Sequence, residues 1–328
     1  MNIKKQTVYT LSALFLFFQC ATIEDYTWKT VTTSNSPSAR HECGFVEVNG
    51  LFYLIGGRGI KPVDIYDVKT KTWSQGAKPP IEIHHFQAVN YKDDIYIIGA
   101  MTGKYPHETP LDNILIYKPK EDAWVWGDTI PESRRRGSAG IVVKNNTAYI
   151  VSGITDGHWS GHVPWVDKYN FNTGMWTVLS DAPRPRDHFQ AALFNNKIYC
   201  ASGRNSSAKT KETFNLTIPE VDVYDIKNNT WETLSESSNI PTQRAGASSV
   251  IKNGNLIVVG GESATQKTAH NAIEIMELKT GNWASGNKLV KGRHGSQAII
   301  YMNSIYITAG SGNRGGKPEL ASLEIFSK

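Results

Sequence analysis

The sequence predicts an all-β fold, and three observations lead to this prediction. A tyrosine is followed seven residues later by a tryptophan at several places along the chain, for example at Tyr66 and Trp73. Each such pair comes after an apolar segment that ends in small residues, as in RHECGFVEVNGLFYLIGG at 40–57. Equivalent positions of successive units lie 43 to 58 residues apart. Four short strands per unit at such a period predict a β-propeller.

A fixed spacing between two large rings indicates two strands joined by a short turn, with both rings in one local core. The five copies of this unit are Tyr66–Trp73, Tyr117–Trp124, Tyr169–Trp176, Tyr224–Trp231 and Met276–Trp283. The upstream unit is marked by the equivalent positions Tyr53, Tyr96, Tyr149, Tyr199, Ile257 and Tyr306. The sequence therefore predicts six blades.

The last blade is incomplete at the end of the chain. Phe326 stands at the tyrosine position, and no tryptophan follows it before Lys328. Near the other end, DYTWKTV at 25–31 carries Trp28. Because ring closure removes exposed sheet edges, we expect the N-terminal strand to join the last blade and close the ring.

The first 24 residues have the features of a signal peptide. A short basic start precedes an apolar run that is too short to cross a membrane as a stable helix. We therefore expect export to the periplasm or cell envelope of a bacterium, with a single propeller over 25–328. Cys20 follows the apolar run as in bacterial lipoproteins, although Gln19 stands where a small residue is normal. Lipidation of Cys20 and simple cleavage nearby both stay open, and a lipid anchor is the only membrane contact expected.

The composition is that of a globular domain with a mild formal charge of +5 and scattered positive residues. It has no basic stripe with interleaved aromatic residues, which argues against nucleic-acid binding. Cys43 and Cys200 replace apolar residues on inner strands, so we expect them in packed cores. No cofactor and no metal ion is predicted. His158 and His162 have a four-residue separation, but they lie in a loop.

An arginine begins the upstream unit in five of the six blades. These residues are Arg40, Arg136, Arg186, Arg244 and Arg293. The loops on their face of the ring are long and variable, as functional loops often are. A ring of guanidinium groups there would bind a carboxylate or sulfate, with Arg58 and Arg204 adding to it. Alternatively, each arginine of the ring bonds to carbonyl groups of the neighbouring blade.

Two histidines occupy the same place in blades 2 and 4, where HHFQA at 84–88 matches DHFQA at 187–191. Beside guanidinium groups, His85 and His188 suit a neutral general base, with His84 next to them. Tyr105 or a second histidine would then protonate the leaving oxygen. Alternatively, these histidines are hydrogen-bonded residues of the channel wall.

Three further residues are candidates for substrate contact. Trp159 and Trp165 would offer apolar ring faces on which a sugar can stack. Glu262 follows the glycine pair of blade 5 and would act as an acid, as a base, or as the partner of an arginine.

The paired glycines followed by a tyrosine and a tryptophan resemble the kelch repeat, over essentially the whole chain after the leader. The chain resembles exported bacterial kelch proteins, among them the six-bladed sialic acid mutarotases (N-acetylneuraminate epimerases), in which Glu262 has a loosely similar counterpart. It also resembles propeller-type lyases and dehydratases of polysaccharide degradation, which implies β-elimination on uronic acids by His, Tyr and Arg. Galactose oxidase is another kelch relative, but its copper site requires a cysteine-linked tyrosine and two histidines that have no matching set here.

These resemblances favour a carbon–oxygen lyase that acts on acidic, uronic-acid-containing oligosaccharides. A glycosidic leaving group would make the enzyme a polysaccharide lyase, and a hydroxyl leaving group would make it a dehydratase. A sialic acid mutarotase is the alternative from the same resemblance. A non-catalytic carbohydrate- or protein-binding propeller is the other alternative.

Overall fold

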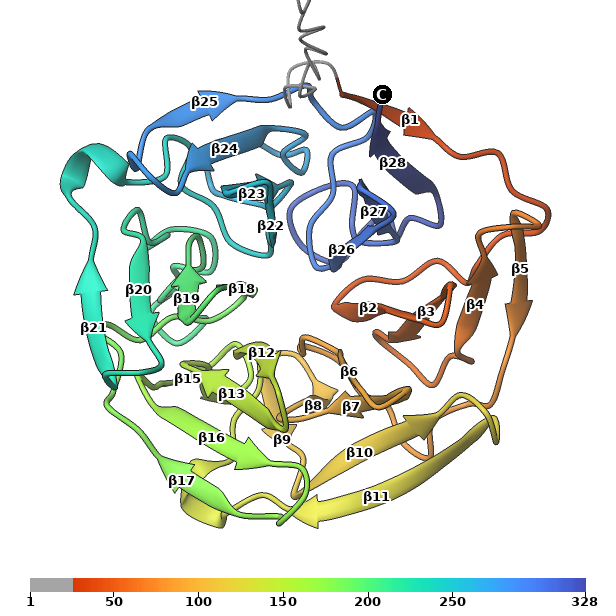
Figure 1. Ribbon diagram of the computed structural model, residues 1–328, viewed down its shortest axis with the longest axis horizontal. Coiled ribbons are helices and arrows are strands. Elements are labelled where there is room, and N and C mark those ends of the chain that lie inside the picture. The colour runs from red at the N-terminus through yellow and green to blue at the C-terminus, as the bar shows by residue number, and fades with distance from the viewer. Residues whose placement is uncertain (1–25) are drawn as a thin grey trace, which may run out of the picture.

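The computed structural model describes residues 26–328, whose strands form six four-stranded antiparallel sheets around a central channel (Figure 1). Blade 1 contains β2 (Cys43–Val48), β3 (Leu51–Gly56), β4 (Asp64–Asp67) and β5 (Thr72–Gln75). Blade 2 contains β6 (Val89–Tyr91), β7 (Asp94–Ile97), β10 (Asn113–Lys118) and β11 (Ala123–Thr129). Blade 3 contains β12 (Gly140–Lys144), β13 (Thr147–Val151), β16 (Val166–Asn170) and β17 (Trp176–Val178). The predicted all-β, six-bladed propeller is confirmed.

The remaining blades follow the same order from the channel outward. Blade 4 contains β18 (Ala191–Phe194), β19 (Lys197–Cys200), β20 (Asp222–Asp225) and β21 (Thr230–Thr233). Blade 5 contains β22 (Ser248–Lys252), β23 (Asn255–Val259), β24 (Ile273–Glu277) and β25 (Trp283–Ser285). Blade 6 contains β26 (Ala298–Tyr301), β27 (Ser304–Thr308), β28 (Leu323–Ser327) and β1 (Thr27–Thr30). The 3₁₀ helices η2 (Glu132–Arg134) and η3 (Glu236–Ser238) lie between blades.

The tyrosine and tryptophan of each repeat pair across the two outer strands of a blade. Tyr66 lies opposite Trp73 on the neighbouring strand, and their ring centroids are 5.1 Å apart. On the outer strand of blade 2, the indole nitrogen of Trp124 donates a hydrogen bond to the carbonyl of Ala77. Ala77 lies in the segment that leaves blade 1. The fixed spacing of seven residues thus builds the outer half of a blade and ties it to the preceding blade.

The N-terminal strand closes the ring, as predicted. β1 pairs with β28 in antiparallel register, with Trp28 opposite Phe326, and the C-terminus lies beside β1 (Figure 1). The two rings stack at a centroid distance of 5.2 Å. The predicted leader and Cys20 lie outside the described residues.

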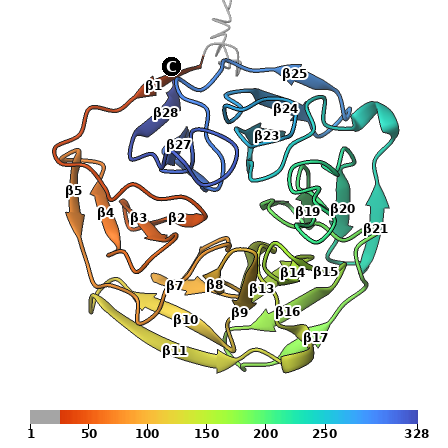
Figure 2. The ribbon, with the colours of Figure 1, turned by 180° about the vertical axis from the view of Figure 1, so that it is seen from behind.

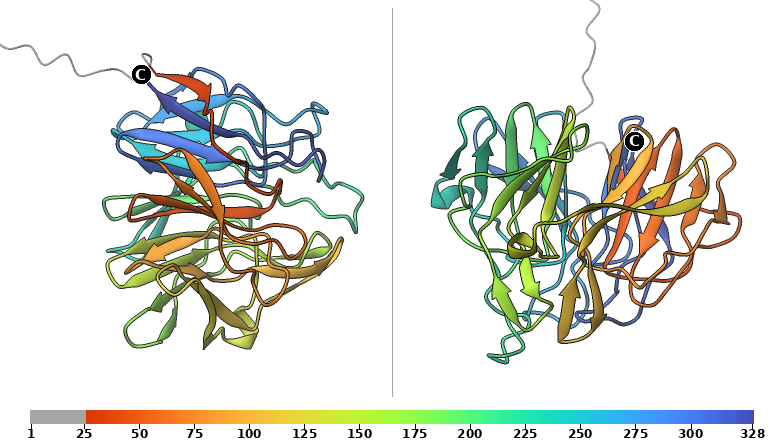
Figure 3. Two further views of the ribbon diagram at one scale, coloured as in Figure 1. Left: turned by 90° about the vertical axis from the view of Figure 1, so that its right-hand side faces the viewer. Right: turned by 90° about the horizontal axis from the view of Figure 1, so that it is seen from below.

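Two hairpins are inserted into the blades on one side of the ring. β8 (Met101–Lys104) and β9 (His107–Pro110) form the first, in blade 2, and β14 (Ile154–Asp156) and β15 (Ser160–His162) form the second, in blade 3. From behind, the two hairpins are seen beside each other (Figure 2), and β14 packs against β9. Side views show that long loops project from this side of the ring (Figure 3). No helix within 26–328 is long and apolar enough to cross a membrane.

The five repeat arginines are inside the blades, and the predicted cationic ring at the channel mouth is wrong. Arg40, Arg136, Arg186, Arg244 and Arg293 are at most 2 % exposed. Each pairs with a carboxylate on the third strand of its own blade, respectively Asp64, Asp167, Asp222, Glu274 and Glu324. Their remaining donors bind carbonyl groups of the same blade, such as Cys200 and Ser202 for Arg186. A buried guanidinium needs all of its donors satisfied, so these side chains are not available to a ligand.

Candidate active site at the channel mouth

Six equivalent positions, one from each blade, meet around the channel axis, and we call them the axial ring. They are Glu42, His85, Ser138, His188, Gly246 and Gly295. Backbone hydrogen bonds connect neighbours in this ring: for example, the amide of His85 donates to the carbonyl of Glu42 at 3.0 Å, and the amide of Gly246 donates to that of His188 at 2.6 Å. The repeat thus aims one residue from every blade at the axis.

All six axial-ring residues have a positive φ, between 49° and 63°. Two blades use glycine, which adopts this conformation without strain, and these blades leave room beside the axis. The other four residues have side chains at positions where a non-glycine residue is strained, and they are Glu42, His85, Ser138 and His188. Strained positions of this kind gather at functional sites, so the backbone marks the axis as a candidate site.

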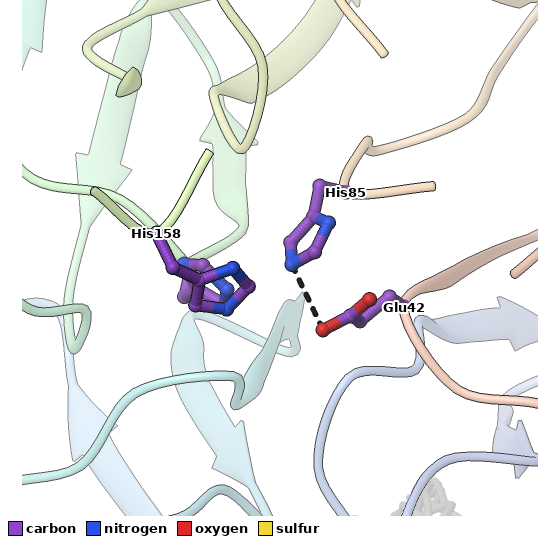
Figure 4. A group of neighbouring side chains, drawn as sticks. Glu42, His85 and His158 are labelled. Carbon is purple, nitrogen blue, oxygen red and sulfur yellow. Dashed lines mark ion pairs between the residues drawn. The ribbon is translucent and has the colours of Figure 1, made fainter. Parts of the chain in front are cut away.

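Three imidazoles and one carboxylate face one another at the axis (Figure 4). The ring centroids of His85, His158 and His188 are 4.7 to 4.9 Å apart, so the three rings form a nearly equilateral triangle. A carboxylate oxygen of Glu42 lies 2.9 Å from Nε2 of His85. His158 comes from the turn of the second hairpin, opposite Glu42 and His85 in Figure 4. Each of these four residues offers one ligand atom, and the four atoms lie within 4.8 Å of one another. Among the described residues, this is the group whose spacing would let it hold a metal ion.

Further polar groups hold the imidazoles from outside. Nδ1 of His158 donates to the carboxylate of Glu108 on β9, at 3.1 Å to each oxygen. Nδ1 of His188 lies 2.9 Å from Asp187. Nδ1 of His85 lies 2.6 Å from Nδ1 of His84. Nδ1 of each imidazole of the triangle thus lies against a polar group, although the contact of His188 with Asp187 lacks hydrogen-bond geometry.

Burial and charge set the protonation of this cluster. Burial lowers the pKa of His85 well below its ordinary value despite the opposing charge of Glu42, and burial followed by the charge of Arg204 lowers the pKa of His188. Burial alone would raise the pKa of Glu42, but the charge of His85 and its contact with that carboxylate outweigh burial and hold it well below the ordinary range. The lowered pKa values favour neutral imidazoles at His85 and His188 and an ionised carboxylate at Glu42 near neutral pH.

The channel opens on the hairpin side into a cavity of about 830 Å³, which we call the mouth cavity. Its wall includes Arg58, Lys104, Tyr105, Arg204, Phe214 and Glu262, and Glu42 and His158 reach it from the axis. Five cationic side chains and four carboxylates line it in all. Among the described residues, Lys104 and Lys317 have no carboxylate partner, whereas Arg58 is held by Glu42 and Glu108. The volume suits a small ligand, and the two free lysines favour an anionic one.

Glu262 is a buried carboxylate in the wall of the mouth cavity, and both of its oxygens have polar partners. One of its oxygens accepts from Arg204 at 2.9 Å, and the other lies 3.3 Å from Nε2 of His294 and accepts the amide of Gly315. Burial opposes ionisation of Glu262, but the charges of His294 and Arg204 lower its pKa. An ionised carboxylate in a ligand-sized cavity can accept a proton from a bound molecule.

The structure brings most of the predicted site residues together. His84, His85 and His188 lie at the channel, and Arg58, Arg204, Tyr105 and Glu262 lie at the mouth cavity. The stacking role predicted for Trp159 and Trp165 is not supported, because neither is among the described residues that line the mouth cavity. The guanidinium of Arg134 covers the ring of Trp165, and the ring of Trp159 contacts His107. Tyr105 and Phe214 are the aromatic side chains in the cavity wall.

Sequence reasoning missed Glu42, Glu108 and the central place of His158. A signal for Glu42 was present, because it has the same repeat position as His85 and His188, two residues after Arg40, Ile83 and Arg186 respectively. No comparable signal exists for Glu108 and His158. They lie in inserted hairpins, outside the repeat, and meet only because two adjacent blades carry these insertions.

Comparisons with known proteins place the repeats in a family. The model of the KLHDC2/KLHL20/DRC7 Kelch-repeats domain matches residues 86–310. The Kelch-like protein terF of Aspergillus terreus is 28% identical over 261 residues, covering 76% of this chain and 54% of that protein. Kelch-like protein 40 of Xenopus laevis is 26% identical over 174 residues, covering 51% of this chain and 27% of that protein. The chain therefore spans about half or less of these relatives.

Among solved structures, that of YjhT aligns with a TM-score of 0.74 at 15% identity, covering 89% of this chain and 96% of that one. At this identity the likeness concerns the fold alone. The family match covers more than half of the sequence and coincides with the blades seen in the structure. The chain belongs to the kelch-repeat family.

Proposed function

We propose that the mouth cavity is the active site of an enzyme that interconverts the anomers of a small acidic sugar, of the sialic acid type. The observation that carries this proposal is Glu262, an ionised and buried carboxylate fixed by Arg204 and His294 in the wall of a ligand-sized cavity. The sequence resemblance to sialic acid mutarotases supports the same reaction.

The reaction needs one base and one acid and no redox step. Glu262 takes the proton of the anomeric hydroxyl, and the C–O bond to the ring oxygen breaks as the carbonyl forms. Tyr105, also in the cavity wall, donates a proton to the released ring oxygen. Lys104 and Lys317 bind the sugar carboxylate at the rim. Closure of the ring on the other face of the carbonyl, with both proton transfers reversed, gives the second anomer.

The test is exchange between the anomer signals of N-acetylneuraminate in a magnetisation-transfer NMR experiment. General acid–base groups contribute about 10² to 10⁴-fold to rate, so Glu262→Gln is expected to slow exchange by about that factor. Glu82→Gln is the matched control, because Glu82 lines the same cavity but accepts only from the amide of Gly59 in an exposed hydrogen bond. The proposal would be overturned if the rate of anomer exchange were the same in Glu262→Gln and in the unchanged protein.

A second candidate, β-elimination on a uronic-acid-containing oligosaccharide, is favoured by the neutral imidazoles of His85 and His188 at the axis. Either imidazole could remove the proton beside the sugar carboxylate as the 4-substituent leaves. The unsaturated product absorbs ultraviolet light. Growth of this absorbance with acidic oligosaccharides, lost in His85→Ala and His188→Ala, would establish elimination in place of anomer exchange. Sugar binding without either reaction would leave a non-catalytic binding propeller.

A further inference from the structure

We propose that Glu42, His85, His158 and His188 bind one divalent transition-metal ion at the channel axis, with Zn²⁺ as the expected occupant. This inference goes beyond the proposed function, whose base is Glu262 and which needs no ion. It also departs from the sequence analysis, which predicts no metal. The donor set is three imidazoles and one carboxylate, which are the ligand types that Zn²⁺ and its neighbours prefer.

The spacing of the four residues fits a single ion. Imidazoles bound to one ion through one nitrogen at about 2.1 Å have ring centroids about 5 Å apart. The three centroid distances here are 4.7, 4.8 and 4.9 Å. The four ligand atoms lie within 4.8 Å of one another, whereas atoms around a tetrahedral ion are separated by about 3.4 Å. Small rotations of the imidazoles, of about 1 Å at the nitrogen, therefore close the set on an ion.

Two of the nitrogens that would bind the ion make no hydrogen bond with any described residue, although Nε2 of His85 lies 2.9 Å from the Glu42 carboxylate. Nε2 of His85 and Nε2 of His188 are buried and accept or donate no hydrogen bond among the described residues. A buried polar atom without a partner is destabilising, and a group left in this state calls for an explanation such as a bound ion. A bound cation would satisfy both nitrogens at once.

His84 lies against His85 from outside the triangle. Its Nδ1 is 2.6 Å from Nδ1 of His85, and its Nε2 is 3.2 Å from the carbonyl of Gly103 and 3.3 Å from a guanidinium nitrogen of Arg58. Nε2 of His85 lies 2.9 Å from a carboxylate oxygen of Glu42. An ion at the axis would contact this nitrogen and this oxygen together.

The outer partners are those expected around metal-binding histidines. Carboxylates of Glu108 and Asp187 lie against Nδ1 of His158 and Nδ1 of His188, at 3.1 and 2.9 Å. Histidine ligands of metal ions almost always donate their second nitrogen to a carboxylate, carbonyl or water, which fixes the ring and raises its basicity. The hydrogen bond to Glu108 fixes the ring of His158, and the Asp187 carboxylate lies beside Nδ1 of His188 without hydrogen-bond geometry. Gly246 and Gly295 leave space at the axis for a further ligand from the channel.

The test is titration of the EDTA-treated and dialysed full chain with Zn²⁺ in a calorimeter. One ion per chain is expected. His188→Ala and His158→Gln are expected to lower the affinity by more than about 100-fold, and Asp187→Asn by about 10- to 100-fold as an outer partner. His107→Ala is the control, because His107 pairs with Asp156 on the outside of the hairpins, with an exposed side chain, and is expected to leave affinity unchanged.

Co²⁺ provides a second measurement, since its visible spectrum reports ligand geometry. The absorption bands expected for the unchanged chain should be lost or shifted in His158→Gln. His158 lies in a hairpin turn outside the blades, so this variant should keep the far-ultraviolet circular dichroism of the folded ring. The proposal would be overturned if the unchanged chain bound neither Zn²⁺ nor Co²⁺. It would also be overturned if His158→Gln and His188→Ala bound these ions as tightly as the unchanged chain does.

Discussion

At the scale of single residues, the axial histidines combine two unfavourable features. His85 and His188 have a positive φ, and each has a buried imidazole nitrogen without a hydrogen-bond partner. Gly246 and Gly295 show that the same repeat position accepts glycine. Side chains that carry such a cost are held in place by the surrounding ring, which is the pattern of a functional site.

The backbone cost at this position can be measured by replacing His188 with two small residues. In the presence of EDTA, His188→Gly is expected to have a higher free energy of unfolding than His188→Ala, by about 1 kcal/mol. Both variants lack the imidazole, so their difference isolates the positive φ of 49°. Urea unfolding followed by circular dichroism measures both values. A more stable alanine variant would contradict the assignment of strain to this position.

At the scale of elements, the inserted hairpins decide how the site is assembled. β9 carries Glu108, and the turn between β14 and β15 carries Gly157 and His158. Gly157 packs directly against Glu108, and the backbone amide of His158 donates to the same carboxylate at 2.8 Å. The hairpin of blade 3 is thus positioned by the hairpin of blade 2, and the two bring His158 to the axis.

Gly157→Ala should separate the two hairpins. A Cβ at this position would lie 1.7 Å from Oε2 of Glu108 and 2.5 Å from its amide nitrogen. Overpacking costs about 1–3 kcal/mol, and alanine at a φ of 42° adds about 1–2 kcal/mol. We expect a lower melting temperature and weaker Zn²⁺ binding, because Glu108 can no longer orient His158.

Gly59→Ala is the control for backbone strain alone. Gly59 also has a positive φ, 78°, but a Cβ there meets nothing within 4 Å. The Gly59→Ala variant is expected to have a free energy of unfolding lower by about 1–2 kcal/mol and an unchanged Zn²⁺ affinity. Equal loss of Zn²⁺ affinity in both variants would show that the hairpin contact does not position the site.

At the scale of the whole molecule, stability depends on closing the circle. β1 is distant in sequence from every other strand of its blade, and it covers the edge that β28 would otherwise expose. Trp28 is 6 % exposed and packs on Phe326 within the core that blades 5 and 6 share. The pairing of β1 with β28 and the packing of Trp28 on Phe326 thus join the first and last strands of the chain.

Trp28→Ala is therefore expected to lower the free energy of unfolding by about 3–5 kcal/mol, as for other large-to-small changes in a core. Trp126→Ala is the matched control, because Trp126 also lies on an outer strand but is 49 % exposed. Its expected cost is below about 1 kcal/mol. Chemical denaturation of both variants tests the difference, and similar costs would mean that the closing strand is not a main support of the ring.

The architecture could be read from the sequence because its signals are local and repeated. The seven-residue spacing from Tyr66 to Trp73 reflects two neighbouring strands, and the missing tryptophan after Phe326 indicates the partner strand at Trp28. The placement of His85 and His188 at the channel followed from the same register. Such features depend on residues that are close in the chain or equivalent in the repeat.

The partners of individual side chains were decided only by the tertiary structure. Arg186 is paired with Asp222, which lies two strands away, so its sequence position beside the loops gave no sign that its charge is neutralised inside the blade. His158 reaches the axis only because Glu108 of another hairpin holds it there. Repetition in a sequence encodes the backbone of each blade. Which charges are buried together depends on contacts between segments far apart in the chain, and these have no pattern along it.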